Sequence, residues 1–157
     1  MSHASEVKSI FLSQLETVIR AAAGYDIGTT VLFDITGGPV WIWALYGVCV
    51  TAEASGGTGR HLINGVNLDT AAVALDSGVD DVIVFPLDDT TTGIVVPNVA
   101  AECLPEITSL NVGGGKVMAS VTPGEISLLI AGANLTGTIA YYCSYYRMTE
   151  RSLITVA

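Results

Sequence analysis

The chain has 157 residues, a length at which one domain can bury a sizeable core without a disulfide or a metal. Apolar residues make up 50% of the sequence and charged residues only 13%, about half of the usual ~25% charged share. The net charge of −9 argues against binding to nucleic acid or to an anionic membrane. Because so few charges cannot coat a whole monomer surface, we expect other chains to cover part of it.

Residues 5–23 have the apolar periodicity of an α-helix. Apolar side chains recur there at three- and four-residue steps and form one stripe. The stripe consists of Val7, Ile10, Phe11, Leu15, Val18 and Ile19. Ser5 is a suitable N-cap, and Gly24 is a suitable end. We expect residues 1–24 to form a short helical arm that lies against the domain, a sister subunit or a host surface.

After Gly24, short apolar runs alternate with turns rich in Gly, Pro, Asn and Asp, a pattern typical of β-strands. The clearest runs cover residues 30–36, 40–52, 125–131 and 138–148, and residues 152–157 form a last strand or an arm. This spacing predicts a mainly-β fold in which residues 25–157 form a single antiparallel β-sandwich or jelly-roll-like domain.

Two turns have specific sequence signals. Asn64-Gly65 lies between apolar runs and suits a type I′ hairpin, because both central positions of that turn need positive φ. Thr122-Pro123-Gly124 separates the runs at 116–121 and 125–131 and also suits a tight turn.

The strand expected at 40–52 is apolar on both faces, so it is either central or at an interface. One face carries Val40, Ile42, Ala44, Tyr46, Val48 and Val50. The other carries Trp41, Trp43, Leu45 and Cys49. In the 138–148 strand, Tyr142 and Tyr146 share one face. A carbohydrate-binding module would use such rings as stacking platforms, but apolar residues on the opposite faces favour a core on one side and a subunit interface on the other.

The sequence contains no pattern typical of catalysis. The two histidines, His3 and His61, have no partner at a metal-binding or triad spacing, and no serine lies in a Gly-x-Ser-x-Gly turn. Residues 113–116 (Gly-Gly-Gly-Lys) lack most of a phosphate loop. We therefore expect no enzymatic activity, no cofactor and no bound metal.

Four acidic residues leave one metal-binding alternative open. Asp80-Asp81 and Asp88-Asp89 flank an expected strand, and their oxygens would suit Ca²⁺ if the two pairs converged. The simpler interpretation is that they mark exposed turns.

Cys49, Cys103 and Cys143 are odd in number and lack a metal-like spacing. We expect reduced thiols, which suit synthesis in a cytosol. We expect neither a signal peptide nor a membrane-spanning segment.

Two parts of the sequence resemble small structural proteins of tailed bacteriophages. The first runs over residues 31–40 (VLFDITGGPV) and 44–48 (ALYGV). The second comprises residues 122–127 (TPGEIS), 134–139 (NLTGTI) and 145–148 (YYRM), and it resembles the closing hairpin of those proteins.

This resemblance implies a virion component made in the bacterial host cytoplasm, with a sandwich or jelly-roll core. It implies a capsid decoration or stabilising protein that forms a trimer or another small ring and docks on virion proteins such as the major capsid protein. The residues that we expect at these interfaces are Val7, Phe11, Leu15, Val18, Trp41, Trp43, Tyr142 and Tyr146. A phage tail or baseplate component and a carbohydrate-binding module of a host-recognition apparatus remain as alternatives.

Overall fold

The computed structural model describes residues 15–67, 72–84, 94–96 and 119–157. These residues form twelve β-strands and no helix. The strands are β1 (Glu16–Ala23), β2 (Gly28–Thr36), β3 (Val40–Thr51), β4 (Thr58–Ile63), β5 (Val66–Asn67), β6 (Val73–Ala74), β7 (Val82–Val84), β8 (Ile94–Val96), β9 (Ala119–Val121), β10 (Gly124–Ala131), β11 (Thr138–Arg147) and β12 (Leu153–Val156). The expectation of a mainly-β protein is confirmed.

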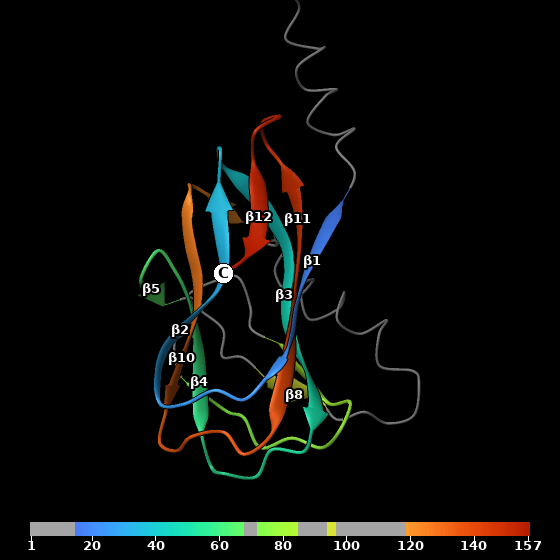
Figure 1. Cartoon of the computed structure of the whole chain (residues 1–157), viewed down its shortest axis with the longest axis vertical. Helices are drawn as coiled ribbons and strands as arrows, with labels where there is room; N and C mark the ends of the chain where they lie inside the picture. The colour runs from blue at the N-terminus through green and yellow to red at the C-terminus, as the bar shows by residue number, and fades with distance from the viewer. Residues whose placement is uncertain (1–14, 68–71, 85–93, 97–118) are drawn as a thin grey trace, which may run out of the picture.

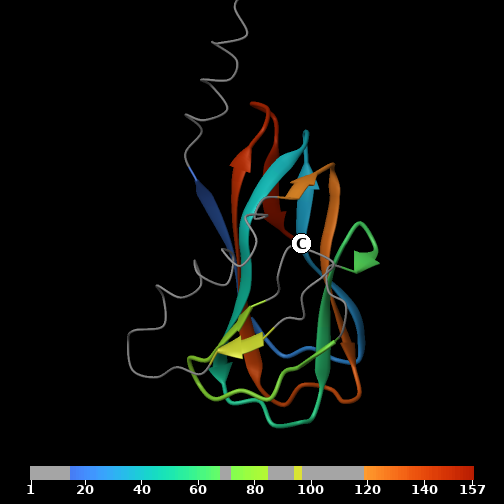
Figure 2. The ribbon, with the colours of Figure 1, turned by 180° about the vertical axis from the view of Figure 1, so that it is seen from behind.

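The strands form two sheets of six, shown from opposite sides in Figures 1 and 2. Sheet A has the order β1-β11-β3-β7-β8, with β9 also beside β3. Sheet B has the order β12-β2-β10-β4-β5, with β6 also beside β4. Neighbouring strands in both sheets run antiparallel.

The core consists of side chains from both sheets. Sheet A contributes Ile42, Leu45 and Tyr141, and sheet B contributes Phe33 and Leu128, each at most 2% exposed. Full burial of an apolar side chain of this size stabilises a fold by about 1.5–3 kcal/mol. The opposite faces of the strands are therefore the surfaces available for binding.

The predicted N-terminal helix is wrong over residues 16–23. These residues form β1, whose register pairs Glu16 with Tyr145 and Val18 with Cys143 of β11. The β-branched run Thr17-Val18-Ile19 fits a pleated sheet better than a helix, and β11 supplies the partner. Residues 16–23 thus belong to sheet A rather than to a separate arm. The rest of the expected helix lies outside the described residues.

The predicted strands at 30–36, 40–52, 125–131 and 138–148 are confirmed as β2, β3, β10 and β11, with β12 as the last strand. The hairpin between β4 and β5 is confirmed too. Ile63 pairs with Val66, and the turn residues Asn64 and Gly65 have φ values of 52° and 77°, as a type I′ turn requires.

The turn at residues 122–124 does not close a hairpin. β9 pairs with β3 in sheet A, whereas β10 pairs with β2 and β4 in sheet B. This turn therefore carries the chain from one sheet to the other.

Candidate functional site

The outward face of sheet A carries a row of aromatic rings. In β11 the side chains of Ile139, Tyr141, Cys143 and Tyr145 point into the core, so the even-numbered residues face outward. Tyr142 pairs with Tyr46 of β3 on one side and with Ile19 of β1 on the other. Tyr146 pairs with Trp41. We call Ile19, Trp41, Trp43, Tyr46, Tyr142 and Tyr146 the outer aromatic face.

A β-bulge at Trp43 separates the two tryptophans of this face from Leu45, which turns into the core. Ser144 pairs with Ala44 while Tyr145 pairs with Ile42, so the register shifts and Trp43 is the extra residue. The predicted division of β3 into two alternating faces is wrong beyond this point. Leu45 and Cys49 turn into the core with Ile42, whereas Trp41 and Trp43 remain half-buried on the outside.

The rings on this face contact one another. Tyr46 and Tyr142 stack with centroids 5.0 Å apart and an interplanar angle of 2°. Trp43 and Tyr146 meet edge to face at 6.3 Å and 84°. Partial burial raises the pKa of Tyr46, and the neighbouring Tyr142 adds to the effect. Because the two stacked tyrosines turn their faces to each other, they do not form the flat open platform on which a sugar ring stacks.

The structure brings together four of the eight predicted interface residues, namely Trp41, Trp43, Tyr142 and Tyr146. Leu15 is 44% exposed just before β1. Val18 faces inward and packs against the core, so it is not part of this face. Val7 and Phe11 lie outside the described residues.

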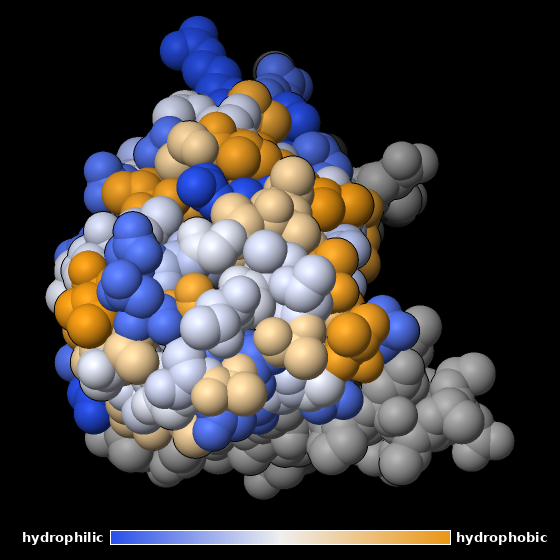
Figure 3. Space-filling model, turned by 60° about the horizontal axis from the view of Figure 1, so that its bottom comes forward, coloured by the Kyte–Doolittle hydropathy of each residue, from blue (hydrophilic) through white to orange (hydrophobic). Residues whose placement is uncertain are grey.

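Ile19, which is 55% exposed, belongs to the outer aromatic face although the sequence assigned it to a helix. Other exposed apolar side chains are Ile27, Val50, Val66, Val79 and Val156. Figure 3 shows apolar residues at several separate places on one end of the molecule. Exposed apolar side chains are thus not confined to sheet A. The described contacts between aromatic rings at the surface, by contrast, all lie on sheet A.

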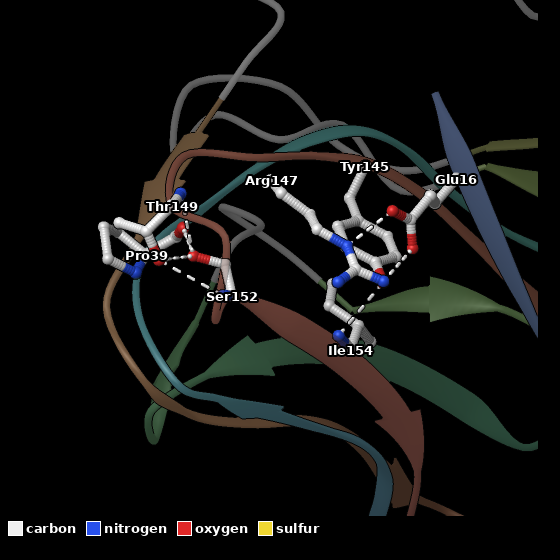
Figure 4. Close-up of polar contacts among 7 residues, drawn as sticks. All are labelled: Glu16, Pro39, Tyr145, Arg147, Thr149, Ser152 and Ile154. Carbon is white, nitrogen blue, oxygen red and sulfur yellow. Dashed lines mark hydrogen bonds and ion pairs between the residues drawn. The ribbon is translucent and has the colours of Figure 1, made fainter. Parts of the chain in front are cut away.

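A polar network fastens β1 to the end of the chain (Figure 4). Arg147 Nη2 donates to Glu16 Oε2 at 2.8 Å, and Arg147 Nε donates to Oε1. The Tyr145 hydroxyl donates to Glu16 at 2.9 Å and accepts from the Ile154 amide at 3.2 Å. The bond to Arg147 holds the pKa of Glu16 below its ordinary value. This network joins β1, β11 and β12 and has a structural role.

Glu53 is a buried carboxylate that the sequence did not single out. It is 2% exposed and accepts hydrogen bonds from the amides of Gly137 at 2.6 Å and Ser55 at 2.7 Å. Burial alone would raise its pKa, but these hydrogen bonds outweigh burial and lower it. Glu53 therefore fastens the loop after β3 to the loop before β11 as an ionised acceptor.

His61 lies in the core. Its imidazole is 0% exposed and meets the Tyr141 ring edge to face at 5.3 Å. Burial lowers the pKa of His61 to about 3, so the ring is neutral at physiological pH. A side chain in this place has no access to a substrate in solvent.

The acidic residues near β7 serve a turn. Asp80 has a φ of 66°, and an Asp81 carboxylate oxygen accepts from the Gly78 amide at 2.6 Å. Asp88 and Asp89 lie outside the described residues. Within the described ranges no three His, Cys, Asp or Glu side chains gather in a way that could hold a metal ion.

No helix in the described part of the chain is long and apolar enough to cross a membrane. Comparison with protein families, with curated proteins and with solved structures found no match to this chain.

Proposed function

We propose that this chain is a structural protein that works by association with copies of itself, and that the outer aromatic face of sheet A is the contact surface. The observation that carries the proposal is the pairing of Trp43 with Tyr146 and of Tyr46 with Tyr142 on the side of the sheet that faces away from the core. Trp and Tyr are the side chains that most often anchor protein interfaces, because they bury a large area at a low cost in side-chain entropy.

The composition supports the same proposal. Only 13% of the residues are charged, and apolar side chains such as Ile19 and Val50 are 55% and 46% exposed on strands of sheet A. Covering this surface with a second copy would remove apolar area from water, worth about 25 cal/mol per Å² buried before the costs of association are subtracted.

Within this class, we propose a virion protein that decorates or stabilises a phage capsid, with a trimer as the favoured ring and the major capsid protein as a partner. The resemblance of residues 31–40, 44–48, 122–127, 134–139 and 145–148 to phage structural proteins supports this assignment. We interpret the two facing sheets as a β-sandwich of the kind those proteins use. A tail or baseplate protein has the same support, and antibody labelling of intact particles distinguishes a head from a tail location.

A carbohydrate-binding module is a weaker candidate. The described aromatic rings at the surface contact each other face to face or edge to face, so they do not lie side by side as one flat platform. Binding to a glycan array would reverse this preference.

The variant Trp43→Arg tests the proposed contact surface. We expect it to lower the mass of the oligomer measured by light scattering, because a charge inside an apolar contact costs several kcal/mol. Val66→Arg is the matched control, since Val66 is 66% exposed on β5 of sheet B, away from the proposed contact. Circular dichroism establishes that both variants fold. An unchanged oligomer in a folded Trp43→Arg variant would contradict the proposal.

A further inference from the structure

β1 forms one edge of sheet A. It pairs with β11 on one side, and no described strand pairs with its other side. Figures 1 and 2 show it at the border of the sheet from both directions. The unpaired backbone N–H and C=O groups of such an edge are a template for a strand from another chain.

Among the strands that the structure describes, β1 is the longest of those at the ends of the two sheets. It has 8 residues, whereas β8, β5 and β12 at the other sheet ends have 3, 2 and 4. Monomeric proteins protect long edges with charged side chains, Pro or a bulge. β1 contains no Lys or Pro, its register shift lies after Arg20, and its charged residues Glu16 and Arg20 lie on the inward face with Tyr145 and Tyr141. Residues 16–20 thus offer a regular edge that carries one acidic and one basic residue.

The sequence of this edge is complementary to itself. Glu16, Val18 and Arg20 pair with Tyr145, Cys143 and Tyr141, so all three lie on the same face of the sheet. When two copies of β1 run antiparallel with Val18 opposite Val18, Glu16 of each copy lies opposite Arg20 of the other. Opposite charges directly across an antiparallel pair stabilise it by about 0.2–1 kcal/mol each, and like charges destabilise it. Any even shift of this register separates the two charge pairs.

Glu16 and Arg20 both retain capacity for this contact. The Glu16 carboxylate is held by Arg147 and Tyr145, and a carboxylate has about four acceptor sites. Arg20 donates through Nη1 to the carbonyl oxygens of Leu32 and Ala157 at 3.2 Å and 2.9 Å, and a guanidinium has about five N–H donors. These bonds hold Glu16 next to β11 and Arg20 against Leu32 and Ala157, and the proposed contact uses their remaining sites.

We propose that two copies of this chain pair through β1, antiparallel and centred on Val18, so that sheet A continues from one subunit into the next. The partner at this edge is a second copy of the chain, because the charge pattern of β1 is complementary to that of an antiparallel copy of the same strand. This inference deepens the self-association proposed above and rests on it. A two-fold contact closes after two chains, so a trimer built through the outer aromatic face would be joined by β1 to a second trimer.

Disulfide cross-linking tests the register. In the proposed pairing, Thr17 of one copy lies opposite Ile19 of the other, at a Cα separation of about 4.5–5.5 Å that a disulfide spans. Two copies of Thr17 are about 8 Å apart, beyond the reach of a disulfide. The experiment uses full-length Thr17→Cys and Ile19→Cys chains that also carry Cys103→Ser. The remaining Cys49 and Cys143 are buried, and burial raises the pKa of Cys143 to about 12.

We expect mild oxidation to link about half of the co-expressed Thr17→Cys and Ile19→Cys chains as dimers, because random pairing makes about half of the dimers mixed. We expect few linked chains when either variant is expressed alone. No linked dimer from the co-expressed pair, or equal linking in all three samples, would overturn the β1 pairing. If linking fails while the native chain remains an oligomer that Trp43→Arg dissociates, the β1 inference is wrong and the outer aromatic face stands. If linking succeeds while Trp43→Arg leaves the mass unchanged, the edge pairing stands and the outer aromatic face is wrong.

Discussion

Replacing Gly37 with Ala is expected to lower the free energy of unfolding by about 3 kcal/mol, as a left-handed backbone and a steric clash combine. Gly37 follows β2 with a φ of +71°. A Cβ atom there would lie 1.8 Å from the backbone carbonyl oxygen of Arg151, which is too close for any contact. The turn after β2 would have to move away from the segment before β12.

Gly65→Ala is the matched control for this variant. Gly65 has nearly the same backbone, with a φ of +77°, but an added Cβ would meet nothing within 4 Å. We expect Gly65→Ala to cost about 1–2 kcal/mol, the conformational part alone. Urea unfolding of both variants measures the difference. Equal losses would show that the close approach of Gly37 to Arg151 contributes nothing.

Acid is expected to destabilise the protein through His61 at a higher pH than through Glu16 and Glu53. The pKa of His61 is about 3 in the fold and 6.5 as a model value. The unfolded chain therefore binds a proton at a pH where the folded chain does not. The stabilisation is complete above pH 6.5 and is lost progressively as the pH falls toward 3. Between pH 7 and pH 5 the loss amounts to about 2 kcal/mol.

The window above pH 5 isolates the histidine, because Glu16 and Glu53 have pKa values lowered from 4.5 and contribute their own loss only at lower pH. Free energies of unfolding at several pH values should decrease toward pH 5 in the native chain and stay level in His61→Leu. His3→Gln removes the only other histidine and should keep the native slope. A slope that survives in His61→Leu would refute the assignment.

Local signals in the sequence predicted the strands well. Asn64-Gly65 identified its hairpin because only a few residues tolerate positive φ, and the turn type follows from that alone. Tyr142 and Tyr146 were expected on one face of their strand, and the structure agrees, since side chains alternate along any regular strand.

The errors concern partners that are distant in the sequence. The spacing of Leu15, Val18 and Ile19 fits a helix, but pairing with β11 decided in favour of a strand. The sequence made no prediction about which sheet the runs on either side of Thr122-Pro123-Gly124 join, and each run finds its neighbours in a different sheet. Pairing between distant segments leaves no local signal.

The sequence predicted which aromatic residues form the candidate site but not how they are arranged. Trp41, Trp43, Tyr142 and Tyr146 were expected at an interface, and the structure gathers them on one face. The bulge that separates Trp43 from Leu45 depends on the register with β11, which the sequence of β3 alone does not reveal. Glu53 had no signal at all, because its partner Gly137 is 84 residues away.

The mass of the native chain in dilute solution is the most direct test of the central claim, that other copies cover the apolar surface of sheet A. Sedimentation equilibrium at micromolar concentration measures it without reference to any particle. The account predicts a multiple of the 16.3 kDa chain mass. A single species of one chain at every concentration would contradict it.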